Sequence, residues 1–372
     1  MTPVLAGALC AACTNDGDQP TPPPIAVEAQ ALWLDSTGWR NGAPHVEIRG
    51  ESVLVFGDTR DEPNRALAVR DAATGEVRWQ VDTRKTLPGE EGLLRAGTSA
   101  QTDMPVVGTD DWTVFLPYAT AAEEFGVAAL AGTNGEARWT SPPVRDRAAG
   151  KLHVLAANDN IVVSMFTGDR TPARTVATDA ATGRRLWESP GVVPQFVVGD
   201  TVLGQTGVPF HSGPEASEPS PDSDLVALDA ATGRKKWDLP GSKVFQTLGE
   251  LAVVSAPGRK LVVDAGTGRE VADLGAVAYC VSNQENLVVC QSDLRGMTFY
   301  DAAERTTSWV AMPDSSLRGT WKDFVFLEDR VVNRSGIEVT DELPGQVIAM
   351  SAEYVVLYDE VTAEFAVHRR TG

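Results

Sequence analysis

Short apolar runs separated by polar breaks extend along most of the chain. The segments "KLHVLAANDNIVVSMF" (151–166), "AYCVSNQENLVVCQ" (278–291) and "VIAMSAEYVVLYD" (347–359) each contain two such runs around one polar turn. Runs of this length, rich in Val, Leu and Ala, are typical of strands, and no long helical period interrupts them. The pattern predicts an all-β chain of antiparallel hairpins.

One hairpin is repeated along the chain. "DAATG" occurs at 71–75, 179–183 and 229–233, each time after an apolar run and four residues before a Trp (Trp79, Trp187 and Trp237). Asp accepts hydrogen bonds from backbone two residues on, and Gly supplies the positive φ of a type I turn with a G1 bulge. A Trp at a fixed offset is predicted to pack between neighbouring sheets rather than to contact a ligand.

Weaker copies fill the rest of the chain and place Trp139 and Trp309 at the same offset. The anchor positions of the eight copies are Gly75, Gly135, Gly183, Gly233, Gly268, Arg305, Gly336 and Gly372. Their mean spacing of about 42 residues is the size of a small four-stranded sheet. Four-stranded antiparallel sheets repeated radially form a β-propeller, so we predict eight blades. Seven blades is the alternative, because the unit at 330–339 is abbreviated.

The two ends of the chain complement each other. The last copy stops at Gly372 without a returning strand, whereas "EAQALWLDS" (28–36) is a lone strand-like run that contains Trp33. We expect this segment to add the missing outer strand of the last blade and close the ring. The predicted organisation is an export signal (1–13), a Pro-rich polar linker (14–28) and the propeller (29–372).

The repeat resembles that of a known family. "VATDAATGRRLW" and "VALDAATGRKKW" are similar to the tryptophan-docking repeat of quinoprotein (PQQ)-like β-propellers, and the resemblance covers nearly all of residues 30–372. Other copies depart from it: Ala131 and His368 replace Asp, Ala272 replaces Trp, and Arg305 replaces Gly. The family contains quinone-dependent dehydrogenases, non-catalytic outer-membrane assembly scaffolds and sensor domains. The resemblance implies eight blades.

The resemblance does not extend to the chemistry of the dehydrogenases. They use adjacent cysteines against the quinone and a divalent metal near a catalytic Asp, and this sequence has no adjacent cysteines. We therefore expect no catalytic residue, no PQQ and no metal site. The four histidines (His45, His153, His211 and His368) lack zinc-site spacing. The acidic pairs Asp58/Asp61 and Asp110/Asp111 do not match a calcium loop and are expected to be solvated.

The four cysteines fall into two pairs with different predicted roles. Cys280 and Cys290 flank a polar turn symmetrically, so a hairpin would place them opposite each other. An exported protein favours a disulfide there, and two buried free thiols are the alternative. Cys13, after two alanines, resembles the lipid-modified residue of a bacterial lipoprotein; Cys10 fits less well because Leu9 is bulky. A frayed cytoplasmic N-terminus is the other interpretation.

The net charge of the chain argues against some classes of partner. The chain has 51 acidic and 32 basic residues, a formal charge of −19. Such a surface repels phosphate backbones, which argues against nucleic acid, and it stays off anionic lipid unless anchored covalently. The insertion at 207–224 and the region at 82–111 are contact surfaces or neutral insertions.

These features together predict an exported propeller on the outer face of the plasma membrane. It would be a lipid-anchored, non-catalytic monomer that binds an envelope protein, peptide or glycan. The alternatives are a divergent quinoprotein-type enzyme with an axial cofactor site and a ligand-sensing domain of an envelope signalling system.

Overall fold

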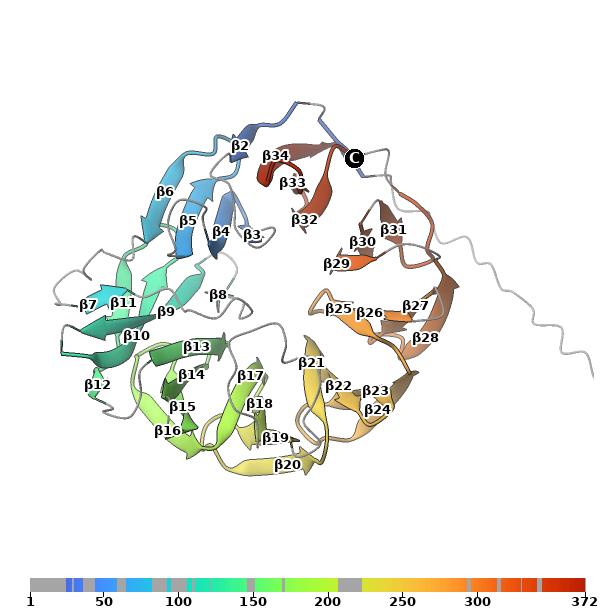
Figure 1. Cartoon of the computed structure of the whole chain (residues 1–372). Helices are drawn as coiled ribbons and strands as arrows, with labels where there is room; N and C mark the ends of the chain where they lie inside the picture. Colours follow the sequence, from blue (N-terminus) through green and yellow to red (C-terminus); the bar gives the residue numbers. More distant parts are fainter. Residues whose placement is uncertain are drawn as a thin grey trace, which may run out of the picture.

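Eight antiparallel sheets are arranged radially around one axis (Figure 1). The computed structural model describes residues 25–28, 30–35, 44–58, 65–81, 92–94, 106–108, 111–120, 122–145, 151–168, 171–206, 223–292, 296–312, 316–328, 330–339 and 343–371. The described residues are strands, bridges and turns, as the short apolar runs predict. The predicted eight-bladed, all-β propeller is confirmed, and the seven-bladed alternative is wrong.

The first four blades follow the chain in order. Blade 1 contains β3 (His45–Arg49), β4 (Ser52–Asp58), β5 (Arg65–Asp71) and β6 (Val77–Val81). Blade 2 contains β7 (Gly92–Leu94), β8 (Val106–Val107), β9 (Thr113–Thr120), β10 (Glu124–Ala131), β11 (Ala137–Thr140) and β12 (Val144–Arg145). Blade 3 contains β13 (Lys151–Ala157), β14 (Ile161–Gly168), β15 (Thr171–Asp179) and β16 (Arg185–Pro190). Blade 4 contains β17 (Val192–Val198), β18 (Thr201–Thr206), β19 (Asp224–Asp229) and β20 (Lys235–Leu239).

The last four blades include the shortest sheet and the closing one. Blade 5 contains β21 (Lys243–Leu248), β22 (Leu251–Ala256), β23 (Arg259–Asp264) and β24 (Glu270–Gly275). Blade 6 contains β25 (Tyr279–Ser282), β26 (Leu287–Ser292), β27 (Gly296–Asp301) and β28 (Thr306–Ala311). Blade 7 contains β29 (Leu317–Trp321), β30 (Phe324–Leu327) and β31 (Val331–Asn333). Blade 8 contains β32 (Gln346–Met350), β33 (Tyr354–Asp359) and β34 (Glu364–Thr371), with β1 (Ala26–Val27) and β2 (Trp33–Asp35) beside β34.

The repeated turn has the mechanism that its sequence indicates. In the first copy the carboxylate of Asp71 accepts hydrogen bonds from the backbone N–H groups of Ala73 (3.0 Å) and Thr74 (2.9 Å). The N–H of Gly75, at φ +73°, donates to the carbonyl of Asp71 (2.9 Å). A bulge follows, so that Trp79 lies opposite Val69. The bulge fixes which face of the blade the indole occupies, because a shift of one residue reverses the face.

Five tryptophans lie between adjacent blades in the same way. The indole N–H of Trp79 donates to the carbonyl of Gly132 in blade 2 (2.6 Å), and a Cβ on Gly135 would lie 2.7 Å from its ring. Each of these indoles therefore occupies the space that the missing side chain of the next turn glycine leaves. The equivalent donors and acceptors are Trp33 to Ala72 (2.9 Å), Trp139 to Ala180 (2.9 Å), Trp187 to Ala230 (2.7 Å) and Trp237 to Ala265 (2.9 Å).

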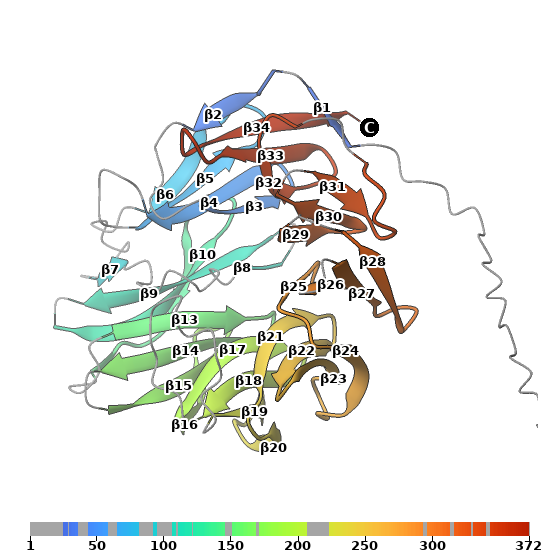
Figure 2. The same ribbon diagram turned by 45° about the vertical axis from the view of Figure 1, so that its right-hand side comes forward.

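The N-terminal segment closes the ring, as expected, but in two pieces. β1 pairs with the end of β34 through Ala26 and Val27, and β2 pairs further along it, with Trp33 opposite Val367. Figure 2 shows both pieces lying along β34. The buried carboxylate of Asp35 adds an ion pair to Arg70 of blade 1 (3.2 Å). The ring is thus closed by a backbone ladder, an indole and an ion pair. Gly372, the turn position of the last predicted repeat, lies outside the described residues.

Trp309 does not occupy the docking position that its spacing predicts. It lies opposite Thr298, one residue out of register with the other copies, because the bulge after the turn is missing in blade 6. The turn there carries Arg305, at φ +53°, in place of Gly. The indole consequently lies on the other face and is 55% exposed. Val310 takes its place against blade 7, where a Cβ on Gly336 would lie 2.5 Å from the Val310 side chain.

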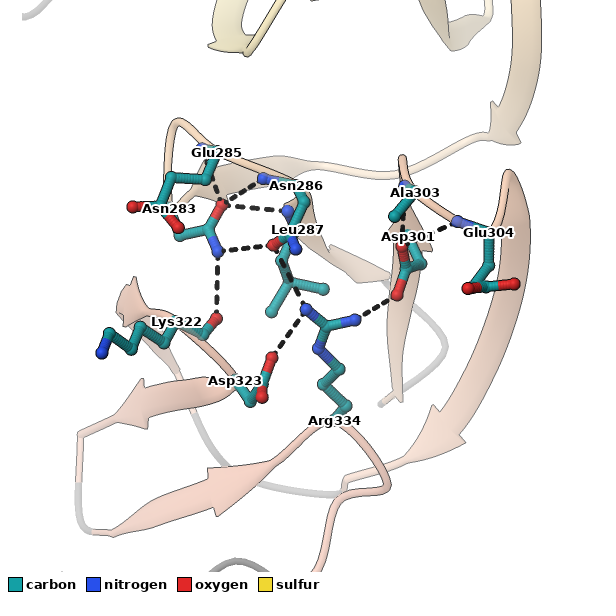
Figure 3. A network of polar contacts seen from close by, with 10 residues as sticks. All are labelled: Asn283, Glu285, Asn286, Leu287, Asp301, Ala303, Glu304, Lys322, Asp323 and Arg334. Atoms are coloured by element: carbon teal, nitrogen blue, oxygen red, sulfur yellow. Dashed lines mark hydrogen bonds and ion pairs between the residues drawn. The ribbon is translucent and has the colours of Figure 1, made fainter. Parts of the chain in front are cut away.

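A polar network joins blades 6 and 7 instead of an indole (Figure 3). Arg334 of blade 7 forms ion pairs with Asp301 of blade 6 and with Asp323 (2.6 Å), and it donates to the amide oxygen of Asn286 (3.2 Å). Asn283 donates to the same oxygen (3.0 Å). Charge-assisted hydrogen bonds of this kind are stronger than neutral ones. They hold the short blade 7 in place.

We predict that Trp33→Ala lowers the free energy of unfolding by about 2–4 kcal/mol, because it removes a packed indole and one hydrogen bond from the ring closure. Leu34→Ala is the matched control: Leu34 is the next residue of β2, is 57% exposed, and should cost less than about 0.5 kcal/mol. Urea unfolding followed by circular dichroism measures both values. Equal losses for the two variants would show that Trp33 does not secure the closure.

The pKa of Asp71 generates a second prediction. The hydrogen bond from Arg78, together with those from Thr74, lowers this pKa to about 2, below the ordinary value of 3.8. Because the folded pKa is lowered, the charge stabilises the fold above about pH 4, and this contribution is lost as the pH falls towards 2. Asp71→Asn should therefore cost about 1–2 kcal/mol at pH 7 and progressively less below pH 4. In an Arg78→Met background the pH dependence of this cost should shrink, and an unchanged dependence would contradict the assignment to Arg78.

Candidate binding site in the axial channel

The innermost strands of four blades line a cavity on the axis of the ring. The cavity has a volume of about 710 Å³ and is bounded by β3, β25, β29 and β32 of blades 1, 6, 7 and 8. These strands lie towards the middle of the ring (Figure 1). Three of the four blades come from the part of the ring where the Trp–Gly contacts are interrupted.

One wall of the cavity is a row of ionisable side chains on β3. His45, Glu47 and Arg49 alternate along the strand and so share one face. Glu47 lies 3.5 Å from the imidazole of His45 and 3.0 Å from the guanidinium of Arg49. Burial raises the pKa of Glu47, but the hydrogen bonds and charges of His45 and Arg49 outweigh it and hold the pKa below its ordinary value. Glu47 is therefore ionised at neutral pH.

The opposite wall combines aromatic rings with polar groups. Tyr279 of β25 is 44% exposed, and Trp321 of β29 stacks on Phe324 with ring centroids 6.0 Å apart. The guanidinium of Arg370 lies 5.4 Å from the Trp321 ring, in the range of a cation–π contact. Arg318 of β29 pairs with Glu328, the residue after β30 (3.3 Å). Aromatic surface with a few polar groups is the usual composition of a ligand-binding cavity.

This arrangement favours binding over acid–base chemistry. A general acid must hold a proton near the working pH, whereas Glu47 is held ionised. Of the described residues that line the cavity, Glu47 is the one carboxylate, and it is paired. Within the described ranges, no group of three or more His, Cys, Asp or Glu side chains is placed to hold a metal ion.

The structure joins Cys280 and Cys290 by a disulfide. They lie opposite each other on β25 and β26, both fully buried, with their sulfurs 2.09 Å apart. Because β25 lines the cavity, the disulfide fixes one of its walls to the strand behind it. The disulfide, between cysteines ten positions apart in the sequence, thus stabilises a strand of the cavity wall.

The remaining predicted residues are dispersed. His45 lines the cavity, His153 is buried in blade 3, and the ring of His368 contacts the carbonyl of Glu28 at the closure (3.0 Å). Asp111 forms an ion pair with Arg138. Several predicted positions lie outside the described residues: Cys10, Cys13, Asp61, Asp110, His211 and most of the segments at 82–111 and 207–224. The cavity itself was missed because its lining strands carry no repeat signature.

We predict that Cys280→Ala/Cys290→Ala lowers the free energy of unfolding by about 3 kcal/mol, the value expected for a cross-link that closes a loop of this size. Guanidinium unfolding without reductant compares this variant with the wild type. When both proteins are unfolded and refolded in excess dithiothreitol, most of the difference should disappear. An equal stability of the two proteins under oxidising conditions would mean that the disulfide does not form.

Comparisons with known proteins agree with the architecture. Residues 123–272 match the family model described as "Outer membrane protein assembly factor BamB". A search of curated proteins finds no match to the sequence. Among solved structures, BamB from Moraxella catarrhalis is 12% identical with a TM-score of 0.53, over 93% of this chain and 99% of that chain. The quinohemoprotein alcohol dehydrogenase from Comamonas testosteroni is 13% identical with a TM-score of 0.55, over 93% and 76%.

The fold is shared more widely than the sequence motif. The C-terminal WD40 domain of Sif2 is 8% identical with a TM-score of 0.54, over 94% of this chain and 99% of that chain. Structural likeness at this level of identity therefore shows the fold alone. The match at 123–272 spans the copies of the turn at Gly135, Gly183, Gly233 and Gly268. The chain is an eight-bladed β-propeller, and its residues 123–272 match a family model of PQQ-like repeats.

Proposed function

We propose that this protein is an exported, membrane-tethered, non-catalytic binding module for a protein, peptide or glycan of the cell envelope. The observation that carries the proposal is the axial cavity, which combines aromatic surface with charged groups that already neutralise one another. Such a site recognises a ligand without supplying an acid, a base or a nucleophile.

The family match supports a place in the envelope. The matching model describes an outer membrane protein assembly factor, and a propeller is a common protein-interaction module. The sequence around Cys13 supports a lipid tether. In the described part of the chain no helix has the length and apolar character needed to span a membrane. The net charge of −19 supports a partner other than nucleic acid.

The test is photo-crosslinking in living cells. A photoreactive residue replaces Tyr279 in the cavity wall of the full-length chain, and Val361, which is 93% exposed in the turn between β33 and β34, is the matched position outside the cavity. We expect an envelope partner, identified by mass spectrometry, to be captured from position 279 in every replicate and not from position 361. Cys13→Ser should move the chain out of the membrane fraction and reduce the yield of the adduct.

Two results would contradict the proposal. Equal labelling from both positions would show that the cavity binds no partner. Oxidation of an alcohol or sugar in a dye-linked assay with added PQQ and Ca²⁺ would show that the protein is an enzyme. Retention of Cys13→Ser in the membrane fraction would overturn the tether alone.

A further inference from the structure

The outer strand of blade 6 differs in composition from the other strands that return from a repeated turn or close the ring. β28 reads "TTSWVA" and contains no charged residue. Every other outer strand that carries the docking Trp or its substitute is charged: β2, β6, β11, β16, β20 and β24. Charges on an edge strand prevent it from pairing with another chain. β28 lacks that protection.

The edge of β28 is also open. β28 is the last strand of its sheet, and none of the described strands pairs with its outer side. Five of its six residues are exposed. Thr, Trp and Val are favoured in strands, and there is no Pro or Gly to interrupt pairing. The edge therefore presents a row of backbone donors and acceptors that only another extended backbone can satisfy together.

Trp309 supplies an apolar anchor beside this edge. Its indole is 55% exposed and covers Gly296 of the neighbouring strand, where any Cβ would overlap the ring. Its face of the blade is the one on which Tyr300 packs with Leu248 and Val262 of blade 5. Because Gly296 has no side chain, the indole packs directly on the sheet. Trp309 is therefore held in place and is still exposed. Tryptophans in such settings are enriched at the centres of protein interfaces.

The blade 5–6 joint differs from the regular joints at this position. In the regular joints a Trp of one blade fills the space over the turn Gly of the next. Here Ala272 stands in place of that Trp and Arg305 in place of that Gly. The outer part of the joint lacks the indole that fills the five regular joints, and Trp309 turns towards it.

We propose that the β28 edge is the docking site for an extended, positively charged segment of a partner protein. The segment pairs with β28 as a fifth strand of blade 6 and places an apolar side chain on Trp309. The inference rests on the proposed binding function and names its surface. The net charge of −19 selects a basic segment, because a second copy of this chain carries the same charge and would be repelled.

The test uses a defined probe and the full-length protein. The probe is a fluorescein-labelled peptide of alternating Lys and Val, acetylated and amidated at its ends. A second peptide of the same sequence is N-methylated at alternate residues, which keeps its charge but removes the donors of one edge. Fluorescence anisotropy at physiological salt measures both affinities. We expect the first peptide to bind at least tenfold more tightly than the second.

Matched variants locate the site. Ser308→Lys places a charge on the β28 edge, and Val77→Lys places the same charge on β6, where Val77 is 44% exposed. Ser308→Lys and Trp309→Ala should each weaken the first peptide by roughly tenfold or more, whereas Val77→Lys should change it less than twofold. Thermal melts of the variants confirm that each is folded. Gly296→Ala, which displaces the indole, should weaken binding of the first peptide in the same way as Trp309→Ala.

Several outcomes would overturn the inference. Equal binding of the two peptides, or equal effects of Ser308→Lys and Val77→Lys, would reduce the interaction to attraction by net charge. A dimer in sedimentation analysis that Ser308→Lys dissociates would assign the edge to a second copy. The binding function is tested separately: an adduct from position 279 with no peptide binding at β28 would leave the function standing and remove this site from it.

Discussion

The contact between one blade's indole and the next blade's turn glycine is the interaction on which this ring depends. The indole needs a bulge to reach the correct face, and the glycine needs an empty Cβ position to admit it. In four of the five turns the carboxylate of the opening Asp holds the turn by accepting a hydrogen bond from the N–H of the Thr three residues on. Five repeats of this unit make the joints from blade 8 through blade 5 nearly equivalent. Regular joints of this kind give each blade a fixed angle to its neighbour.

Of the joints where the contact is missing, one has lost both partners and the next has lost only the indole. Ala272 and Arg305 replace the two partners at the joint between blades 5 and 6, and Val310 meets Gly336 at the next joint. The Arg334 network then joins blades 6 and 7 where no indole lies between them, and the disulfide cross-links two strands within blade 6. The axial cavity and the exposed Trp309 both belong to this part of the ring. Without the Trp–Gly contact, the side chains at these joints are not constrained by an indole packed between the blades.

The sequence predicted the blades, their number and the closing strand because each depends on a local signal. Asp, Gly and Trp at fixed offsets indicate a turn and its returning strand. The last copy of the repeat has no Trp, and Trp33 in the N-terminal segment is the residue that completes it. Trp309 has the same offset from Asp301 as Trp79 has from Asp71, yet it faces the other way. The difference lies in one bulge, which spacing alone does not report. The cavity escaped prediction because His45, Tyr279 and Trp321 come together only when the ring closes.

The position of the closing strand has a consequence for the order of folding. β2 is among the first strands to be synthesised, and its partner β34 is the last. Trp33 therefore cannot pair with Val367 until the end of the chain has been made. Contacts this distant in sequence carry the largest loop-closure entropy and form late. Until then blade 8 lacks its outer strand and blade 1 lacks the indole that covers Gly75. A chain truncated before β34 lacks the partner of both β2 and β33, so both ends of the ring stay unpaired and open to proteolysis.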